Sequence, residues 1–266
     1  MQSNMPLTAL LYLILLSTSV IVYLTRYHDP TLLVGLTRED GPVEWATVLA
    51  LVAFSALLFH WMRKLRSRIS GRLRIAGYGL AVLALLAAGE EISWGQRLFG
   101  FETGETMKKL NHQQEMNLHN LLPGELFNGL IIFAVGLYMI ALPMVWRAWK
   151  KGPEPWWLPS KELSLLTLAT ILVNHYRVTS LPEKAGLVIL GLLLVAATIQ
   201  AIAQKHPRHL AACLIGWLTG GVLYHCRDVL RAANMQYEIR ELLVILLAVR
   251  YCAEALEKLE RCGSVK

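Results

Sequence analysis

The chain has 266 residues, of which 55% are hydrophobic and only 17% are charged. Its mean hydropathy of +0.44 is too high for an ordinary soluble domain, which excludes the water-soluble globular class. The net charge of +7 fits basic loops beside anionic lipid headgroups better than it fits nucleic-acid binding, so we expect membrane lipids and no nucleic acid as partners.

Long apolar segments recur along the chain at the lengths expected of membrane-spanning helices. A hydrocarbon core of roughly 30 Å needs about 20 mostly apolar residues in a helix. The segments are unbroken apolar runs, unlike the roughly ten-residue alternating segments of an outer-membrane barrel. They predict an all-α polytopic transmembrane helix bundle of about eight spans, forming one integral membrane domain over residues 1–266. The predicted spans are 7–24, 43–62, 75–94, 126–146, 163–178, 185–203, 210–225 and 242–256.

The first apolar segment is interpreted as a membrane anchor, because residues 1–6 carry no basic group and no clear small-residue cleavage site follows. Short cytoplasmic loops carry the excess of Lys and Arg in membrane proteins. Here the basic residues follow the second, fourth, sixth and eighth segments, which predicts a multi-pass protein of the cell inner membrane with both termini in the cytoplasm. The residues concerned are Arg63, Lys64, Arg66, Arg68, Arg72, Arg74, Arg147, Lys150, Lys151, Lys205, Arg208, Lys258, Arg261 and Lys266.

Acidic residues stand at the predicted outer ends of the second and third segments. Glu44 opens the second, where the helix dipole favours a carboxylate, so a structural role and a catalytic role have equal support. Glu90 and Glu91 close the third, where the dipole disfavours negative charge. We therefore expect one of the pair to meet a metal, a proton or a cation, of which Arg97 is the simplest candidate.

The outer loop of residues 101–122 is polar but contains recurrent apolar residues, which predicts a helix lying in the membrane interface, with Thr103 as a candidate cap. In such a helix His112, Glu115 and His119 would lie within about 60° of one another, since seven residues make almost two turns. This set suits zinc binding or proton transfer. Loop residues in contact with water explain the same spacing equally well. Two asparagines of the loop, Asn117 and Asn120, are candidates to orient a polar headgroup.

The later segments bring further polar residues to the same predicted side. His175 ends the fifth segment, and His225 ends the seventh with Arg227 and Asp228 directly behind it. His225 and Asp228 are three residues apart, which makes them neighbours on one helix surface if the helix continues. The predicted cytoplasmic side offers mainly basic residues instead. Arg250, inside the eighth segment, has Glu254 one turn later and is interpreted as a structural ion pair.

Three segments carry a resemblance to a group of multi-pass bacterial membrane proteins of uncharacterised function: residues 39–45 (EDGPVEW), 89–97 (GEEISWGQR) and 117–120 (NLHN). The similarity spans roughly residues 39–122, and it implies no activity. The grouping of histidines and acidic residues at one face also distantly resembles the alkaline ceramidase type of seven-span zinc amidase. The chain departs from that family, because only His225 stands where two late histidines are expected and Glu90 and Glu91 have no counterpart.

The pattern favours a metal-dependent hydrolase or transferase that acts on a lipid or lipid-linked substrate at the outer leaflet. Its expected metal is zinc or another divalent ion, with no nucleotide, because the chain contains no glycine-rich phosphate loop. A proton-coupled transporter and a noncatalytic scaffold or assembly factor remain alternatives. Three sets of residues are expected to form the site: metal ligands His119, His175, His225 and Asp228; catalytic Glu91, Glu90 and Glu44; substrate-binding Arg97, Asn117, Asn120 and Arg227.

Overall fold

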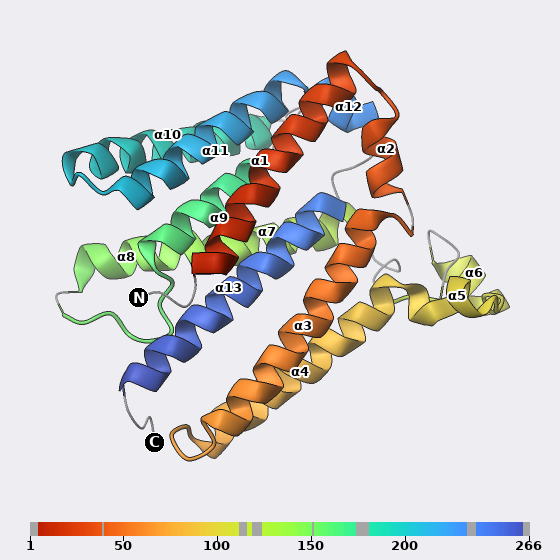
Figure 1. Ribbon diagram of the computed structural model, residues 1–266, viewed down its shortest axis with the longest axis horizontal. Coiled ribbons are helices and arrows are strands. Elements are labelled where there is room, and N and C mark those ends of the chain that lie inside the picture. Colours follow the sequence, from red (N-terminus) through yellow and green to blue (C-terminus); the bar gives the residue numbers. More distant parts are fainter. Residues whose placement is uncertain are drawn as a thin grey trace. The chain divides into compact units, whose positions relative to one another are not determined.

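The computed structural model describes residues 5–38, 40–111, 116–118, 124–150, 152–173, 181–232 and 238–262. Within these ranges every regular element is helical and none is a strand, which confirms the predicted all-α class. Backbone contacts divide the chain into two compact units (Figure 1). Unit 1 comprises Met1–Arg38 and Ala134–Ala255, and unit 2 comprises Glu39–Phe133 and Leu256–Lys266.

Unit 1 is organised around α11, which packs against α1, α9 and α10. At Gly216, helices α9, α10 and α11 lie close together: an added Cβ would make van der Waals contact with Leu194 Cδ1 of α10 at 3.4 Å and with Ala169 Cβ of α9 at 3.5 Å. Two helices, α7 and α13, contribute residues to both units. The helices of unit 1 and these two are α1 (Met5–Tyr27), α2 (Leu32–Thr37), α7 (Gly124–Gly136), α8 (Leu142–Trp149), α9 (Lys161–Val173), α10 (Leu181–Ala203), α11 (Pro207–His225), α12 (Arg227–Ala232) and α13 (Glu238–Cys262), with a π-helical turn at Leu137–Ala141.

Unit 2 is built on an antiparallel hairpin of α3 (Pro42–Lys64) and α4 (Gly71–Glu91), which lie side by side in Figure 1. Ser55 Oγ donates a buried hydrogen bond to the Ala81 carbonyl at 2.8 Å. Gly77 leaves room for Met62, because a Cβ there would stand 2.2 Å from the Met62 sulfur. A 3₁₀ turn (Ser93–Gly95), α5 (Gln96–Phe99) and α6 (Glu105–Leu110) follow α4.

Five segments in the described part of the chain are long and apolar enough to cross a membrane, by length and composition: Leu7–Tyr27, Leu32–Lys64, Gly71–Glu91, Leu130–Trp149 and Lys184–Ala203. Each of the eight predicted spans overlaps a helix in its described residues, although the fourth is divided by the π-helical turn. The remaining helices, α9, α11 and α13, do not meet the same criteria within the described residues. The structure is thus compatible with a polytopic membrane protein, and the number eight stays a prediction.

The interfacial helix expected over residues 101–122 is not confirmed. Among the described residues of this stretch, 101–111 and 116–118, the helical ones are those of α6, and Asn111 and residues 116–118 are not helical. Thr103 does not cap α6, because Gly104 is the residue before its first turn and makes no side-chain cap. His112 and Glu115 lie outside the described residues.

Candidate functional site

The chain reverses sharply at the end of α4 through three successive left-handed residues. Ser93, Trp94 and Gly95 have φ values of 46°, 57° and 76°. Glycine adopts this conformation without strain, but for other residues it costs roughly 1–2 kcal/mol each. The turn therefore depends on compensating contacts, and strained backbone of this kind often marks a position where the chain must hold one geometry.

Glu90 supplies part of that compensation from the last turn of α4. Its Oε1 atom accepts a hydrogen bond from Trp94 Nε1 at 2.6 Å, and its Oε2 atom accepts one from the backbone N–H of Leu118. The carboxylate thus holds both the strained turn and the incoming loop. The cation, metal or proton expected beside the acidic pair stays a prediction.

Asn117 fixes the loop from the other side, and its side chain is only 1% exposed. Its Nδ2 atom donates to Ser93 Oγ at 2.9 Å, while its Oδ1 and backbone oxygen accept from Asn111 Nδ2 at 2.7 and 2.8 Å. Gln96 adds a further contact, because its Oε1 atom accepts from the Met116 N–H at 2.9 Å. We call Glu90, Ser93, Gln96, Asn111 and Asn117 the α4 latch.

The two other acidic candidates lie at the same end of the hairpin as the α4 latch. Since Ser55 contacts Ala81 in antiparallel helices, the start of α3 lies beside the end of α4. Glu44 is buried and its Oε2 atom accepts from the Asp40 N–H at 2.6 Å, a contact of the capping-box kind. Glu91 is half-buried in the last turn of α4. The structure therefore brings Glu44, Glu90, Glu91 and Asn117 to one end of unit 2.

In unit 1, the candidate residues His225 and Asp228 contact α1. α11 ends at His225 and α12 begins at Arg227 after a turn at Cys226, so His225 and Asp228 lie on successive helices, and both contact Arg26. His225 Nε2 shares a hydrogen bond of 2.7 Å with the Tyr27 hydroxyl, and its carbonyl accepts from Arg26. Asp228, whose side chain is 61% exposed, forms an ion pair of 2.5 Å with Arg26.

Arg227 lies at the same end of α11. Its guanidinium carbon stands 4.5 Å from the centre of the Tyr224 ring, and Nη1 donates to the Tyr224 carbonyl at 2.9 Å. Among the described residues it has no ion-pair partner. The positive charge therefore remains available to an anion at this edge of unit 1.

The other predicted site residues cannot be placed. His119, Asn120 and His175 lie outside the described residues. Arg97 belongs to α5, and only its backbone is described. The convergence of the predicted metal ligands accordingly remains a prediction.

At the opposite end of unit 1, the predicted pair of Arg250 and Glu254 is present. Arg250 Nη1 lies 3.1 Å from Glu254 Oε2, and both side chains are less than a tenth exposed. Arg250 Nε also donates to Thr8 Oγ1 at 2.8 Å, which ties α13 to α1. The structural interpretation of this pair is confirmed.

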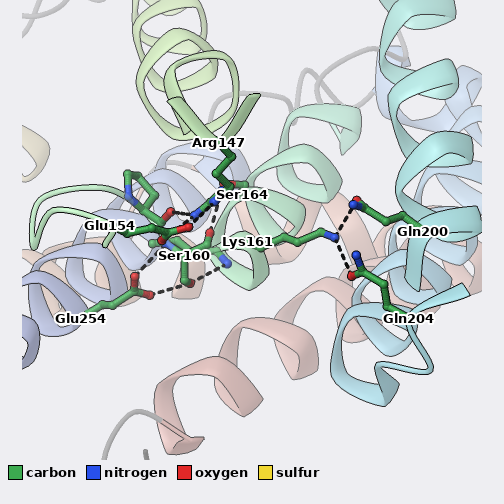
Figure 2. A network of polar contacts seen from close by, with 10 residues as sticks. Arg147, Glu154, Ser160, Lys161, Ser164, Gln200, Gln204 and Glu254 are labelled. Carbon is green, nitrogen blue, oxygen red and sulfur yellow. Dashed lines mark hydrogen bonds and ion pairs between the residues drawn. The ribbon is translucent and has the colours of Figure 1, made fainter. Parts of the chain in front are cut away.

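Sequence reasoning missed the rest of the network, which Figure 2 shows from Glu254 to Gln200. Glu254 accepts from the Ser160 N–H at 2.8 Å and from its hydroxyl at 2.7 Å (Figure 2). Ser160 Oγ in turn accepts from the Leu163 N–H at 3.2 Å, so it caps α9. The cap had a signal in the sequence, a serine directly before an apolar run, but its acidic partner is 94 residues away.

Two basic side chains complete the network. Arg147 donates to both carboxylate oxygens of Glu154, at 2.7 and 3.2 Å, and to the Pro159 carbonyl. Lys161 Nζ donates to Gln200 Oε1 at 2.7 Å, and Figure 2 shows it reaching from α9 to α10. Burial, with the nearby Arg147 charge, lowers the pKa of Lys161. The network thus joins α8, α10 and α13 to α9 and to the loop that precedes it.

We expect His209, near the start of α11, to make the protein's stability depend on pH. Burial lowers its pKa to about 4, with His206, Lys161 and Arg147 adding repulsion of the charged form. Its ring stacks on His206 at 3.6 Å. An unfolded histidine has a pKa of about 6.5, so the unfolded chain binds more protons between these two values. We expect the melting temperature to fall as pH drops from about 6.5 to 4, and to fall less in His209→Gln. Parallel pH profiles of the two proteins would contradict this.

No protein-family model, curated protein or solved structure matches the chain. The resemblances carried by residues 39–45, 89–97 and 117–120 therefore stay predictions. The functional argument rests on the two polar ends described above.

Proposed function

We propose that the chain crosses the cell inner membrane eight times, with both termini in the cytoplasm. The five apolar segments of suitable length support insertion, and α9, α11 and α13 supply the three further spans. The charge distribution of unit 2 supports the orientation. The turn between α3 and α4 is basic, while the opposite end of the same hairpin carries Glu44, Glu90 and Glu91.

We further propose that the acidic end belongs to a metal-dependent hydrolase or transferase acting on lipids at the outer leaflet. The observation that carries this proposal is the α4 latch, which fixes the strained turn directly after Glu91, at the end of the hairpin that also carries Glu44. A catalytic carboxylate needs a fixed geometry relative to its substrate. Glu91 is the proposed general base.

The fit to a metal differs among the proposed ligands. His225 suits the role, because the Tyr27 hydroxyl occupies Nε2 and leaves Nδ1 for coordination, the arrangement in which a second contact orients a ligating imidazole. Asp228 suits it less well, since the Arg26 guanidinium already neutralises its charge and would repel a cation. The proposed ligand set is therefore His119, His175 and His225.

A bound zinc or similar ion would supply Lewis-acid activation of water. Proton transfer and substrate binding would be carried out by side chains of the protein itself. Glu91 would take the proton from the attacking water at its carboxylate, and Arg227 would bind an anionic headgroup through its unused N–H donors. Asn117, which is fully engaged in the α4 latch, would act by positioning the loop.

The test is elemental analysis of detergent-purified protein beside Glu91→Ala, His119→Ala and His225→Ala. His28→Ala is the matched control, because His28 is an exposed histidine directly after α1, at the end where Tyr27 contacts His225. We expect near-stoichiometric metal in the wild type and in His28→Ala, with loss in His119→Ala and His225→Ala. Absence of metal from wild type purified without chelators would contradict the enzyme proposal.

A noncatalytic scaffold is the second candidate, and a specific observation favours it. Every described polar side chain of the α4 latch has a partner within the latch or its loop. A loop fixed in this way is also a suitable docking surface for another protein. Absence of metal together with loss of a co-purifying protein in Asn117→Ala would favour this candidate.

A further inference from the structure

A cavity of about 260 Å³ lies between α10 and α11, at the edge of unit 1, and Leu172 of α9 also lines it. Its lining consists of leucines, glycines and two aromatic residues. The volume is somewhat below the roughly 300–1,000 Å³ of closed small-molecule sites. It therefore suits part of a long apolar ligand better than a whole compact one.

Four glycines line the cavity, one in α10 and three in α11. A Cβ added to Gly216 or Gly220 would make only ordinary van der Waals contacts, the nearest at 3.4 and 3.7 Å. Gly191 and Gly221 have no heavy atom within 4 Å of an added Cβ. The four glycines therefore leave the space of the cavity free of their own side chains.

Part of the cavity wall is exposed, and one of its side chains is held by a hydrogen bond. The Trp217 indole N–H donates to Thr198 Oγ1 at 3.1 Å, which fixes the ring against α10. Trp217, Gly221 and Tyr224 are all exposed along this side of α11, and Leu192 of α10 is exposed beside them. In the proposed membrane topology this opening faces the acyl chains of the bilayer.

One end of the cavity carries a positive charge. Tyr224 lines the cavity, and the Arg227 guanidinium stands 4.5 Å from the centre of its ring. Arg227 donates only one hydrogen bond in the described part of the chain, to the Tyr224 carbonyl. An apolar groove that ends beside a guanidinium is complementary to a ligand with a hydrocarbon chain and an anionic headgroup.

We propose that this groove binds one acyl chain of an anionic phospholipid, whose phosphate contacts Arg227. A second copy of the protein fits less well, because a copy inserted in the same orientation would bring a like charge to the same membrane depth. The inference names the substrate class of the proposed function and rests on its membrane topology. It does not depend on a bound metal.

The test is photolabelling in nanodiscs of phosphatidylethanolamine and phosphatidylglycerol, with a trace of phosphatidylglycerol carrying a diazirine in its acyl chain and a chelator present. Mass spectrometry of the digested protein locates the labels. We expect them to concentrate on residues 187–194 and 216–224. Gly191→Leu and Gly221→Leu, which fill the groove from different helices, should each reduce this labelling several-fold.

Gly79→Leu is the matched control, because Gly79 is an exposed glycine of α4 that also has no heavy atom within 4 Å of an added Cβ. It should leave the labelling unchanged. Arg227→Gln should reduce labelling by the phosphatidylglycerol probe several-fold and labelling by a phosphatidylethanolamine probe less, because the ammonium of that headgroup offsets the charge of its phosphate. Labels spread evenly over all helices, or labelling insensitive to both groove variants, would overturn the proposal. If the probe labels the groove of a protein that holds no metal, the proposed lipid site is supported and only the proposed metal-dependent activity is contradicted.

Discussion

Glu254→Ala should lower the free energy of unfolding by about 3–5 kcal/mol, the usual cost of removing one partner from a buried ion pair. The side chains of Arg250 and Glu254 are 7% and 9% exposed, so the substitution leaves a guanidinium charge without its partner in the interior. It also removes the acceptor of the Ser160 N–H and hydroxyl, which fix the start of α9. Equilibrium unfolding in mixed micelles with increasing dodecyl sulfate measures the change.

Two comparisons isolate the ion pair. The double variant Arg250→Met, Glu254→Met removes both charges and should recover much of the loss, because an apolar pair often replaces a buried ion pair at little cost. Arg261→Ala, on the same helix, breaks only an exposed pair with Glu257 and should change stability by less than about 0.5 kcal/mol. A double variant less stable than Glu254→Ala would show that the charge on Arg250 is not the source of the effect.

The helices were predictable from the sequence because each rests on a local property. Long apolar runs gave all eight segments, and Pro42 and Pro207 stand in the first turns of α3 and α11, where proline costs no hydrogen bond. The Arg250 and Glu254 pair was predictable for the same reason, since residues four apart on a helix are neighbours. The fourth segment was predicted as one continuous helix, but the structure divides it by a π-helical turn at Leu137–Ala141. Hydropathy gives no signal for such a turn.

The candidate site was less predictable because its contacts join distant residues. The partners of Glu90 are an indole four residues away and a backbone N–H 28 residues away. Glu90 and these partners meet because residues 93–95 adopt left-handed backbone conformations. Serine and tryptophan rarely adopt such conformations, so the sequence does not predict the turn. The same holds for His225 and Asp228, whose partners on α1 lie about 200 residues earlier in the chain. Hydropathy and spacing contain no information about such pairings.

Asn117→Ala should release the outer loop from the end of α4. The substitution removes the donor to Ser93 Oγ and one of the two acceptors of Asn111 Nδ2, at a site that is almost fully buried. Loss of hydrogen bonds of this kind costs about 1–3 kcal/mol, which corresponds to exchange about fivefold to 150-fold faster for amides that exchange through loop opening. Hydrogen–deuterium exchange at the Met116 and Leu118 amides, which donate to Gln96 and Glu90, measures this directly.

Leu118→Ala is the control for the loop, because the Leu118 side chain is 62% exposed and only its backbone N–H contacts Glu90. Its exchange should match that of the wild type. If the α4 latch holds the catalytic carboxylates, Asn117→Ala should also reduce turnover while leaving bound metal unchanged, since none of the proposed ligands belongs to the latch. Wild-type exchange rates in Asn117→Ala would mean that Glu90 and Gln96 hold the loop without it, and the positioning role would then pass to those two residues.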